Sequence, residues 1–121
     1  MPGRLAIDFG ASNTIAARWD ETRQESETLH VPDYGRFYAQ GENRISVIPS
    51  LIHYVSEQQR WIGNQVLQRN LYDSRRTFRW MKRYITHRSP VRRRLNGGQV
   101  SYFDAGRDFL LSVLVFAGQT G

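Results

Sequence analysis

The segment Asp8–Thr14, with the sequence Asp-Phe-Gly-Ala-Ser-Asn-Thr, combines residue types that can bind a phosphate and a metal ion. An aspartate at the end of a strand projects into the following turn, where its carboxylate can hold a hydrated Mg²⁺. Gly10 lets the backbone curl, so that the amides of the small residues after it can point at phosphate oxygens. A hairpin with a glycine turn and a capping aspartate explains the same pattern, so the segment alone leaves both interpretations open.

Lys82 is the second candidate, because it is the only lysine among seventeen basic residues. Its compact charge can reach a terminal phosphate or an attacking water, although an exposed lysine on a helix is the ordinary alternative. His30, His53 and His87 lack the spacing of metal ligands, and we interpret them as structural.

The composition bounds the class of protein. The chain has 121 residues, 40% of them apolar, which is enough for one domain with a buried core. It contains no cysteine, which excludes disulfides, thiol catalysis and zinc ribbons. No run of about 18 uncharged apolar residues predicts a membrane span, and the first residues lack the pattern of a signal peptide. We therefore expect a cytoplasmic protein without membrane contacts.

The charge is concentrated in one segment. The net charge is +6, and ten of the seventeen basic residues lie between Arg69 and Arg94, opposed only by Asp73. A segment this basic favours an anionic partner such as a phosphate, a nucleic acid or an acidic protein surface. A solvated helix face is the alternative, and the charge alone does not separate the two.

The elements that must position these residues change in character near residue 32. Short apolar runs at 4–8, 14–19 and 25–31 predict an antiparallel meander of three strands. A loop is expected over 32–44. The apolar run 45–55 predicts a strand that Pro49 interrupts, with 60–62 as a short partner.

The second half of the chain has a helical pattern. We expect a short helix over 64–70 and a second helix with Ser74 as its N-cap, ended by Pro90. On that second helix Phe78, Met81 and Ile85 would form the apolar face, and Arg75, Arg79, Lys82 and Arg83 a basic stripe.

The C-terminal part predicts a hairpin and a last helix. Residues 95–99 favour a hairpin turn leading into a strand at 100–103. Asp104 is the expected N-cap of a helix over 105–117. That helix is apolar almost all round, which is typical of a helix inside a larger core.

Taken in order, five segments resemble one family. They are IDFGASNT, IPSLIHYV, WIGNQVLQRN, TFRWMKRYI and the apolar helix after FDAGRDF. Their order and spacing resemble the start of the 70-kDa heat-shock (DnaK-like) chaperones, in the actin–hexokinase ATPase superfamily. Several of these segments differ in sequence from the usual family motifs, which points to an atypical bacterial branch. The resemblance covers nearly the whole chain.

The resemblance implies an α/β fold of the ribonuclease-H-like, actin-like ATPase lobe I, in incomplete form. Residues 1–31 would be three strands of subdomain IA with the first phosphate motif. Residues 32–103 would be subdomain IB, and 104–121 the start of the helix returning to IA.

The resemblance also implies a site for ATP or ADP with Mg²⁺. Asp8 would lie near Mg²⁺ through water, as one of two catalytic residues. The other, Lys82, would orient the attacking water, and Arg83 would line the cleft. The amides of Gly10, Ala11, Ser12 and Asn13 would contact the β- and γ-phosphates.

One departure concerns hydrolysis. The family usually has two threonines after the glycine, the first placing a hydroxyl near the γ-phosphate, whereas this chain has Ala11-Ser12. Ala11 keeps an amide but lacks that oxygen, so ATP binding should survive better than hydrolysis.

The family's second phosphate motif, adenosine motif and peptide-binding domain have no counterpart here. We therefore expect an N-terminal fragment of a chaperone-type ATPase, weak or inactive alone. Its affinity for Mg-ATP should be no tighter than roughly 0.1 mM, and its exposed strands and apolar helix favour self-association. Client polypeptides and co-chaperones are partners implied by the family only.

Two other functions remain open. The chain could be a small nucleic-acid-binding module in which Phe78, Trp80 and Tyr84 stack on bases between arginines, although no recognition motif supports this. Its arginines would be Arg75, Arg76, Arg79, Arg83, Arg92, Arg93 and Arg94. It could also be a partner-binding domain without catalysis.

Overall fold

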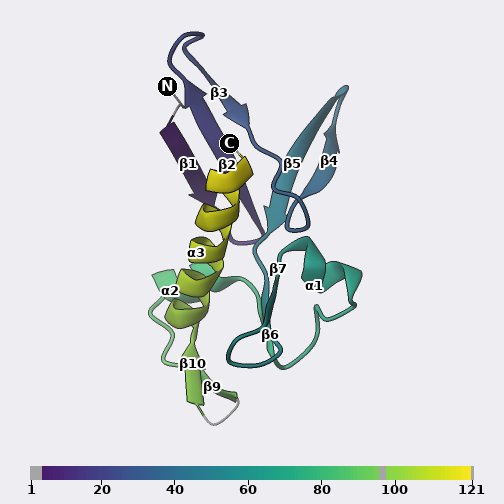
Figure 1. Cartoon of the computed structure of the whole chain (residues 1–121). Coiled ribbons are helices and arrows are strands. Elements are labelled where there is room, and N and C mark those ends of the chain that lie inside the picture. The colour runs from purple at the N-terminus through teal and green to yellow at the C-terminus, as the bar shows by residue number, and fades with distance from the viewer. Residues whose placement is uncertain (1–3, 96–97, 121) are drawn as a thin grey trace.

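A computed structural model describes residues 4–95 and 98–120, and over these residues the chain is a sheet-rich α/β fold (Figure 1). The N-terminal part is the predicted antiparallel meander, in which β2 pairs with β1 on one side and β3 on the other. These strands span Arg4–Phe9 (β1), Asn13–Asp20 (β2) and Glu25–Thr28 (β3).

The expected loop over 32–44 is wrong in part, because a further hairpin begins there. β4 (Arg36–Gln40) pairs with β5 (Asn43–Pro49), and β5 joins β2 through the pairs Asn13↔Pro49 and Thr14↔Ile48. β4 is an edge strand whose Phe37 and Tyr38 are both exposed. Its sequence therefore lacks the apolar alternation that identifies a half-buried strand.

The predicted interruption at Pro49 is confirmed. β5 ends there, and β6 (Ile52–Tyr54) opens a second sheet with β7 (Arg60–Ile62). The short helix that follows is α1 (Asn64–Gln68), close to its expected position.

The predicted helix start at Ser74 is wrong. Thr77–Phe78 forms a short strand, β8, on the free edge of β6, and α2 spans only Met81–Thr86. Ser74 instead closes a turn, because its hydroxyl accepts a hydrogen bond from the Arg76 amide. Phe78, Arg75 and Arg79 therefore lie outside the helix, and the expected helical stripes do not form. A sheet partner supplied by the fold outweighed the local helix pattern.

A hairpin leads into the last helix. Its strands β9 (Arg92–Leu95) and β10 (Gly98–Ser101) pair, which confirms a hairpin, while residues 96 and 97 of the expected turn lie outside the described residues. The expected strand 100–103 is wrong in its second half, because 102–103 belong to the last helix. The helix α3 (Tyr102–Thr120) follows directly. Ser101 and Asp104 form a reciprocal capping box: Asp104 N–H donates to Ser101 Oγ, and Ser101 N–H donates to the Asp104 carboxylate. Asp104 is thus the third residue of the helix, and Ser101 is the N-cap in its place.

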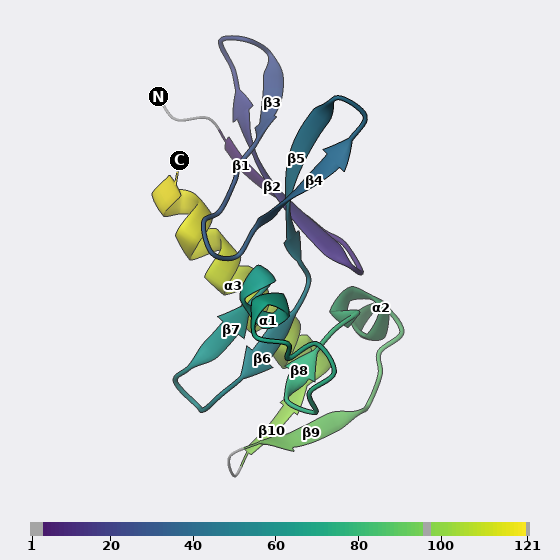
Figure 2. The ribbon, with the colours of Figure 1, turned by 90° about the vertical axis from the view of Figure 1, so that its right-hand side faces the viewer.

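α3 joins the two sheets into one core. In both views it rises from the β9–β10 hairpin towards the meander (Figures 1 and 2). Its buried face is made of Ala105, Phe109, Val113 and Ala117, which pack with residues of both sheets. Leu111, Leu114 and Val115 are exposed on its other side, as the nearly uniform apolar pattern predicted. Over the described residues, no helix is both long and apolar enough to cross a membrane.

Candidate anion-binding site

The turn between β1 and β2 depends on Gly10. A Cβ atom at this position would overlap the carbonyl oxygen of Asn13, so a larger residue would force the backbone apart. The ladder closes at the pair Phe9↔Thr14, which leaves residues 10–13 as the connection. The glycine of the motif is therefore required by a close approach of backbone to backbone.

Ser50 fixes the position of this turn. Its Oγ donates to the Gly10 carbonyl at 2.9 Å, and its amide donates to the Ser12 carbonyl at 2.9 Å. Thr14 Oγ1 lies 2.8 Å from Ser50 Oγ. Because the single hydroxyl proton of Ser50 is used for Gly10, Thr14 is the donor in that pair. Ser50 and Thr14 are both buried. Ser50, which follows the last residue of β5, therefore holds the turn from its buried side.

The exposed residues of the turn offer backbone amides as hydrogen-bond donors. Ala11, Ser12 and Asn13 are exposed, and no acceptor in the described part of the chain takes a hydrogen bond from the amide of Ala11 or Ser12. Exposed amides of successive residues in a turn form a concavity that suits an anion.

These residues line a hollow of about 220 Å³ together with two arginines. Arg36 comes from β4, and Arg79 from the segment between β8 and α2. The exposed aromatic side chains of Tyr38, Tyr72 and Trp80 complete the rim. No carboxylate is among the described residues that line the hollow. The hollow is therefore positively charged.

Arg79 is held in place at this rim. Its Nη1 donates to Asp73 Oδ1 at 2.8 Å and to the Tyr72 carbonyl at 3.3 Å. Its guanidinium lies over the rings of Tyr72 and Trp80, 4.6 and 5.1 Å from their centroids. The hydrogen bond to Asp73 raises the pKa of Arg79 further above its usual range. Trp80 adopts a left-handed backbone conformation (φ 55°), which is uncommon for a bulky residue.

The structure brings only some of the expected site residues together. Ala11, Ser12 and Asn13 line the hollow, whereas Asp8, Gly10, Lys82 and Arg83 do not. Lys82 and Arg83 are exposed on α2 and Asp8 is exposed on β1. Their expected roles stay predictions.

The donor set near the turn is compatible with magnesium only in a limited way. The described residues contain no group of three histidine, aspartate or glutamate side chains that could hold a metal ion. Mg²⁺ is commonly bound by one or two carboxylates, several waters and the phosphates of a substrate. Asp8 can supply such a single carboxylate, so the metal would have to arrive with the phosphates.

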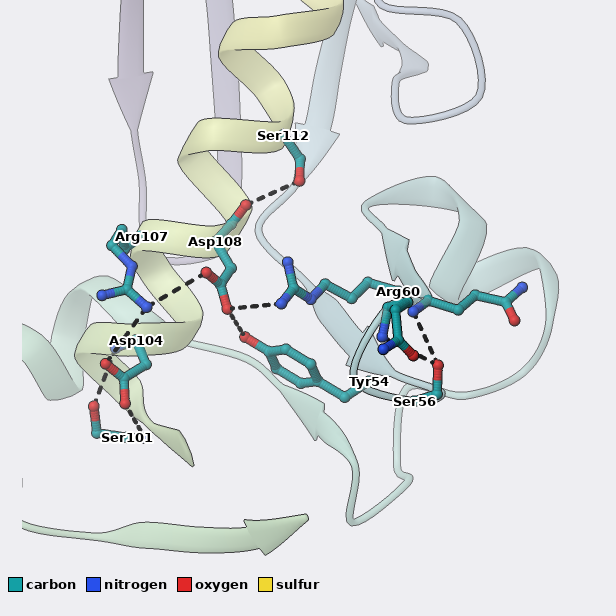
Figure 3. Close-up of polar contacts among 10 residues, drawn as sticks. Tyr54, Ser56, Arg60, Ser101, Asp104, Arg107, Asp108 and Ser112 are labelled. Carbon is teal, nitrogen blue, oxygen red and sulfur yellow. Dashed lines mark hydrogen bonds and ion pairs between the residues drawn. The ribbon is translucent and has the colours of Figure 1, made fainter. Parts of the chain in front are cut away.

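A second polar cluster lies at the start of α3 (Figure 3). Tyr54 Oη donates to Asp108 Oδ2 at 2.6 Å, and the side chains of Arg60 and Arg107 lie 3.7 and 3.6 Å from the two oxygens of the same carboxylate. Burial, followed by the hydrogen bond to Asp108, raises the pKa of Tyr54 far above its usual range. The cluster ties α3 to β6 and β7, and its charges neutralise one another.

Much of the basic segment also serves the fold. Arg76 Nε donates to the Tyr54 carbonyl at 2.6 Å, and Arg93 Nη1 donates to the Arg75 carbonyl at 2.9 Å. The Arg93 guanidinium lies over Phe78, which is completely buried. Phe78 therefore cannot stack on a base, which removes one support of the nucleic-acid hypothesis.

Two of the three histidines have internal partners. His53 Nδ1 lies 2.8 Å from Thr77 Oγ1, and His30 Nδ1 lies 2.8 Å from Ser46 Oγ. Because Thr77 Oγ1 donates to the Leu71 carbonyl, His53 is the donor to Thr77. Burial and the nearby charge of Arg76 lower the pKa of His53. These contacts agree with a structural interpretation.

The sequence interpretation missed several contributors, among them Ser50, Arg36, Tyr38 and Tyr72. Ser50 belongs to the quoted segment IPSLIHYV, and its position after Pro49 was the available signal. Arg36 and Tyr38 lie in a segment expected to be a loop, and no local pattern marked them.

No protein-family model matches the chain, and a comparison with curated proteins found no match.

Proposed function

We propose that the turn 10–13 binds the phosphates of Mg-ATP in a chaperone-type ATPase of the DnaK-like family. One observation carries the phosphate part of the proposal. Ala11 and Ser12, whose amides have no acceptor among the described residues, line a hollow whose charged lining residues are Arg36 and Arg79. Fixed amide dipoles and guanidinium groups are the main means by which proteins stabilise phosphoryl groups.

The family part of the proposal depends on the five ordered segments. An actin-like lobe would use β1–β3 and α3 as subdomain IA, with 32–103 as subdomain IB. The antiparallel meander and a helix packed beside it are compatible with that arrangement. Client polypeptides, co-chaperones and a cytoplasmic location follow from the resemblance and the composition, and they remain proposals.

In the proposed mechanism the chain positions the phosphates, and charged and polar groups stabilise the negative charge of the phosphoryl group. Amides of the turn would bind phosphate oxygens, and Asp8 would hold Mg²⁺ through water. Lys82 would orient the attacking water. Since Ala11 supplies no hydroxyl, we expect binding to be retained and hydrolysis by this chain to be slow or absent.

Calorimetric titration with Mg-ATP tests the proposal. We expect a dissociation constant weaker than roughly 0.1 mM, since one lobe supplies only part of the contacts. A micromolar constant would contradict the half-site, and the lack of any binding up to about 10 mM would contradict the phosphate site. In a protein that carries both lobes, Lys82→Ala should abolish ATP turnover while the melting temperature stays unchanged.

A further inference from the structure

The two arginines of the hollow, Arg36 and Arg79, come from segments that are far apart in the sequence. Arg36 lies on the edge strand β4 and Arg79 just before α2, yet both line the hollow beside residues 11–13. Arg36 lies outside the five segments of the resemblance, and Arg79 belongs to TFRWMKRYI but has no role that the resemblance implies. Their common position is a product of the tertiary structure.

Arg79 keeps donors available. A guanidinium has five N–H groups, and both hydrogen bonds of Arg79 in the described part of the chain leave from Nη1, to Asp73 and to the Tyr72 carbonyl. By distance and angle the three N–H groups on Nη2 and Nε make no hydrogen bond with the described residues, although interaction with the Tyr72 side chain also raises the pKa of Arg79. Asp73 thus orients the guanidinium without using the donors that a phosphate would need.

Arg36 is less constrained. It is exposed, and its side chain makes no hydrogen bond or ion pair with the described residues, while its backbone is paired with Val47 of β5. A long exposed side chain on an edge strand can move towards an anion at little cost, because it has no polar contact to give up.

We propose that Arg36 and Arg79 form a clamp for the terminal phosphates of a nucleoside polyphosphate whose phosphate chain lies against the amides of Ala11 and Ser12. This inference rests on the proposed function and adds two contact residues to it. Planar guanidinium groups match the geometry of phosphate oxygens and bind them through paired hydrogen bonds. Because two arginines and two residues with unpartnered amides line the same hollow, the clamp should prefer a triphosphate chain to a monophosphate.

The test titrates the chain with inorganic tripolyphosphate by calorimetry at constant ionic strength, which removes differences in screening. We expect Arg36→Gln and Arg79→Gln each to weaken binding by about threefold to tenfold. Arg44→Gln and Arg88→Gln are matched controls, since they remove one exposed positive charge outside the hollow. These controls should bind like the unchanged chain. Arg36→Gln also covers the case in which Arg79→Gln fails to fold, because the exposed side chain of Arg36 makes no hydrogen bond or ion pair with the described residues.

The outcomes separate the clamp from the proposed function. If Lys82→Gln weakens binding while both hollow variants bind normally, the phosphate site stands and the clamp is refuted. If all four arginine variants weaken binding equally, the effect is net charge and the clamp is refuted. If the chain binds a single-stranded oligonucleotide but no tripolyphosphate, both proposals are refuted in favour of nucleic acid.

Discussion

Two polar hollows in the described part of the chain contain similar residues but differ in how far their charges are paired. The hollow beside the β1–β2 turn is lined by Arg36 and Arg79, with no carboxylate among its described lining residues. The hollow at the start of α3 is lined by Arg60 and Arg107 together with Glu57, Asp104 and Asp108.

The difference lies in what the charged groups already contact. At the start of α3 each guanidinium has a carboxylate within 4 Å, and the carboxylate of Asp108 also accepts a hydrogen bond from buried Tyr54. Beside the turn, the Arg36 side chain has no such partner in the described chain. Arg79 has a carboxylate at 2.8 Å, that of exposed Asp73, but its hydrogen bonds engage Nη1 alone. Charged residues in a hollow therefore indicate a ligand site only where their hydrogen bonds and charges are not already satisfied internally.

The largest expected effect is on stability, at the second hollow. Asp108→Ala leaves the buried hydroxyl of Tyr54 without its acceptor, so we expect a loss of about 1–3 kcal/mol in the free energy of unfolding. Urea denaturation measures this loss. Tyr54→Phe is the matched variant and should cost less, because Asp108 keeps its two arginines. Both variants should bind phosphate as the unchanged chain does, which would support the view that the hollow at α3 is structural and only the hollow beside the turn binds phosphate. A strong loss of phosphate binding would contradict this distinction.

A somewhat smaller effect is expected from Ser50→Ala below the turn. The variant removes the donor to the Gly10 carbonyl and the acceptor for Thr14, which should cost about 1–2 kcal/mol and weaken tripolyphosphate binding by loosening the turn. Ser46→Ala, at a buried serine bonded to His30, should lower stability without changing phosphate binding. If both serine variants bind phosphate normally, Ser50 does not position the site.

A carboxylate of the second hollow, that of Asp104, should also make the stability of the fold depend on pH in the acid range. Hydrogen bonds from the Ser101 backbone are the largest cause of the lowered pKa of Asp104. A lowered folded-state pKa gives stability that is present above the unfolded value near 4 and is lost as pH falls through the folded value. Thermal melts between pH 6 and pH 2.5 should therefore show a decline that Asp104→Asn reduces. An identical pH profile for the variant would contradict this assignment.

The smallest expected effect concerns the outer face of α3, away from both hollows. Leu111 and Val115 are more than half exposed, and exposed apolar side chains favour weak association between copies of the chain. We expect light scattering to show an apparent mass that rises with concentration, and Val115→Glu to reduce that rise with a change in stability within about 0.5 kcal/mol. A monomer at every concentration would contradict self-association.

Local patterns predicted the elements whose signals are local. The meander, the interruption at Pro49, the short strand β7 and α1 all follow from apolar runs, a missing amide donor and turn residues. The nearly all-apolar character of α3 likewise predicted both a buried and an exposed apolar face.

One error occurred where a partner distant in sequence determined the outcome. Thr77 and Phe78 form β8 because β6 presents an edge to them. Two other errors concern near neighbours: β4 forms a hairpin with β5, and Asp104 is the third helical residue because Ser101 is the N-cap. In these two cases the local signal was present but was compatible with more than one structure.

The candidate site divides in the same way. The sequence by itself determined the turn, since Gly10 and the small residues after it specify a tight hairpin with exposed amides. Only the tertiary structure decided which charges face that turn, because packing brings Arg36 and Arg79 beside it while Lys82 and Arg83 lie on the exposed side of α2. Backbone conformation follows from near neighbours and steric limits, whereas the electrostatic field at a site is the sum over groups that only the folded chain brings together.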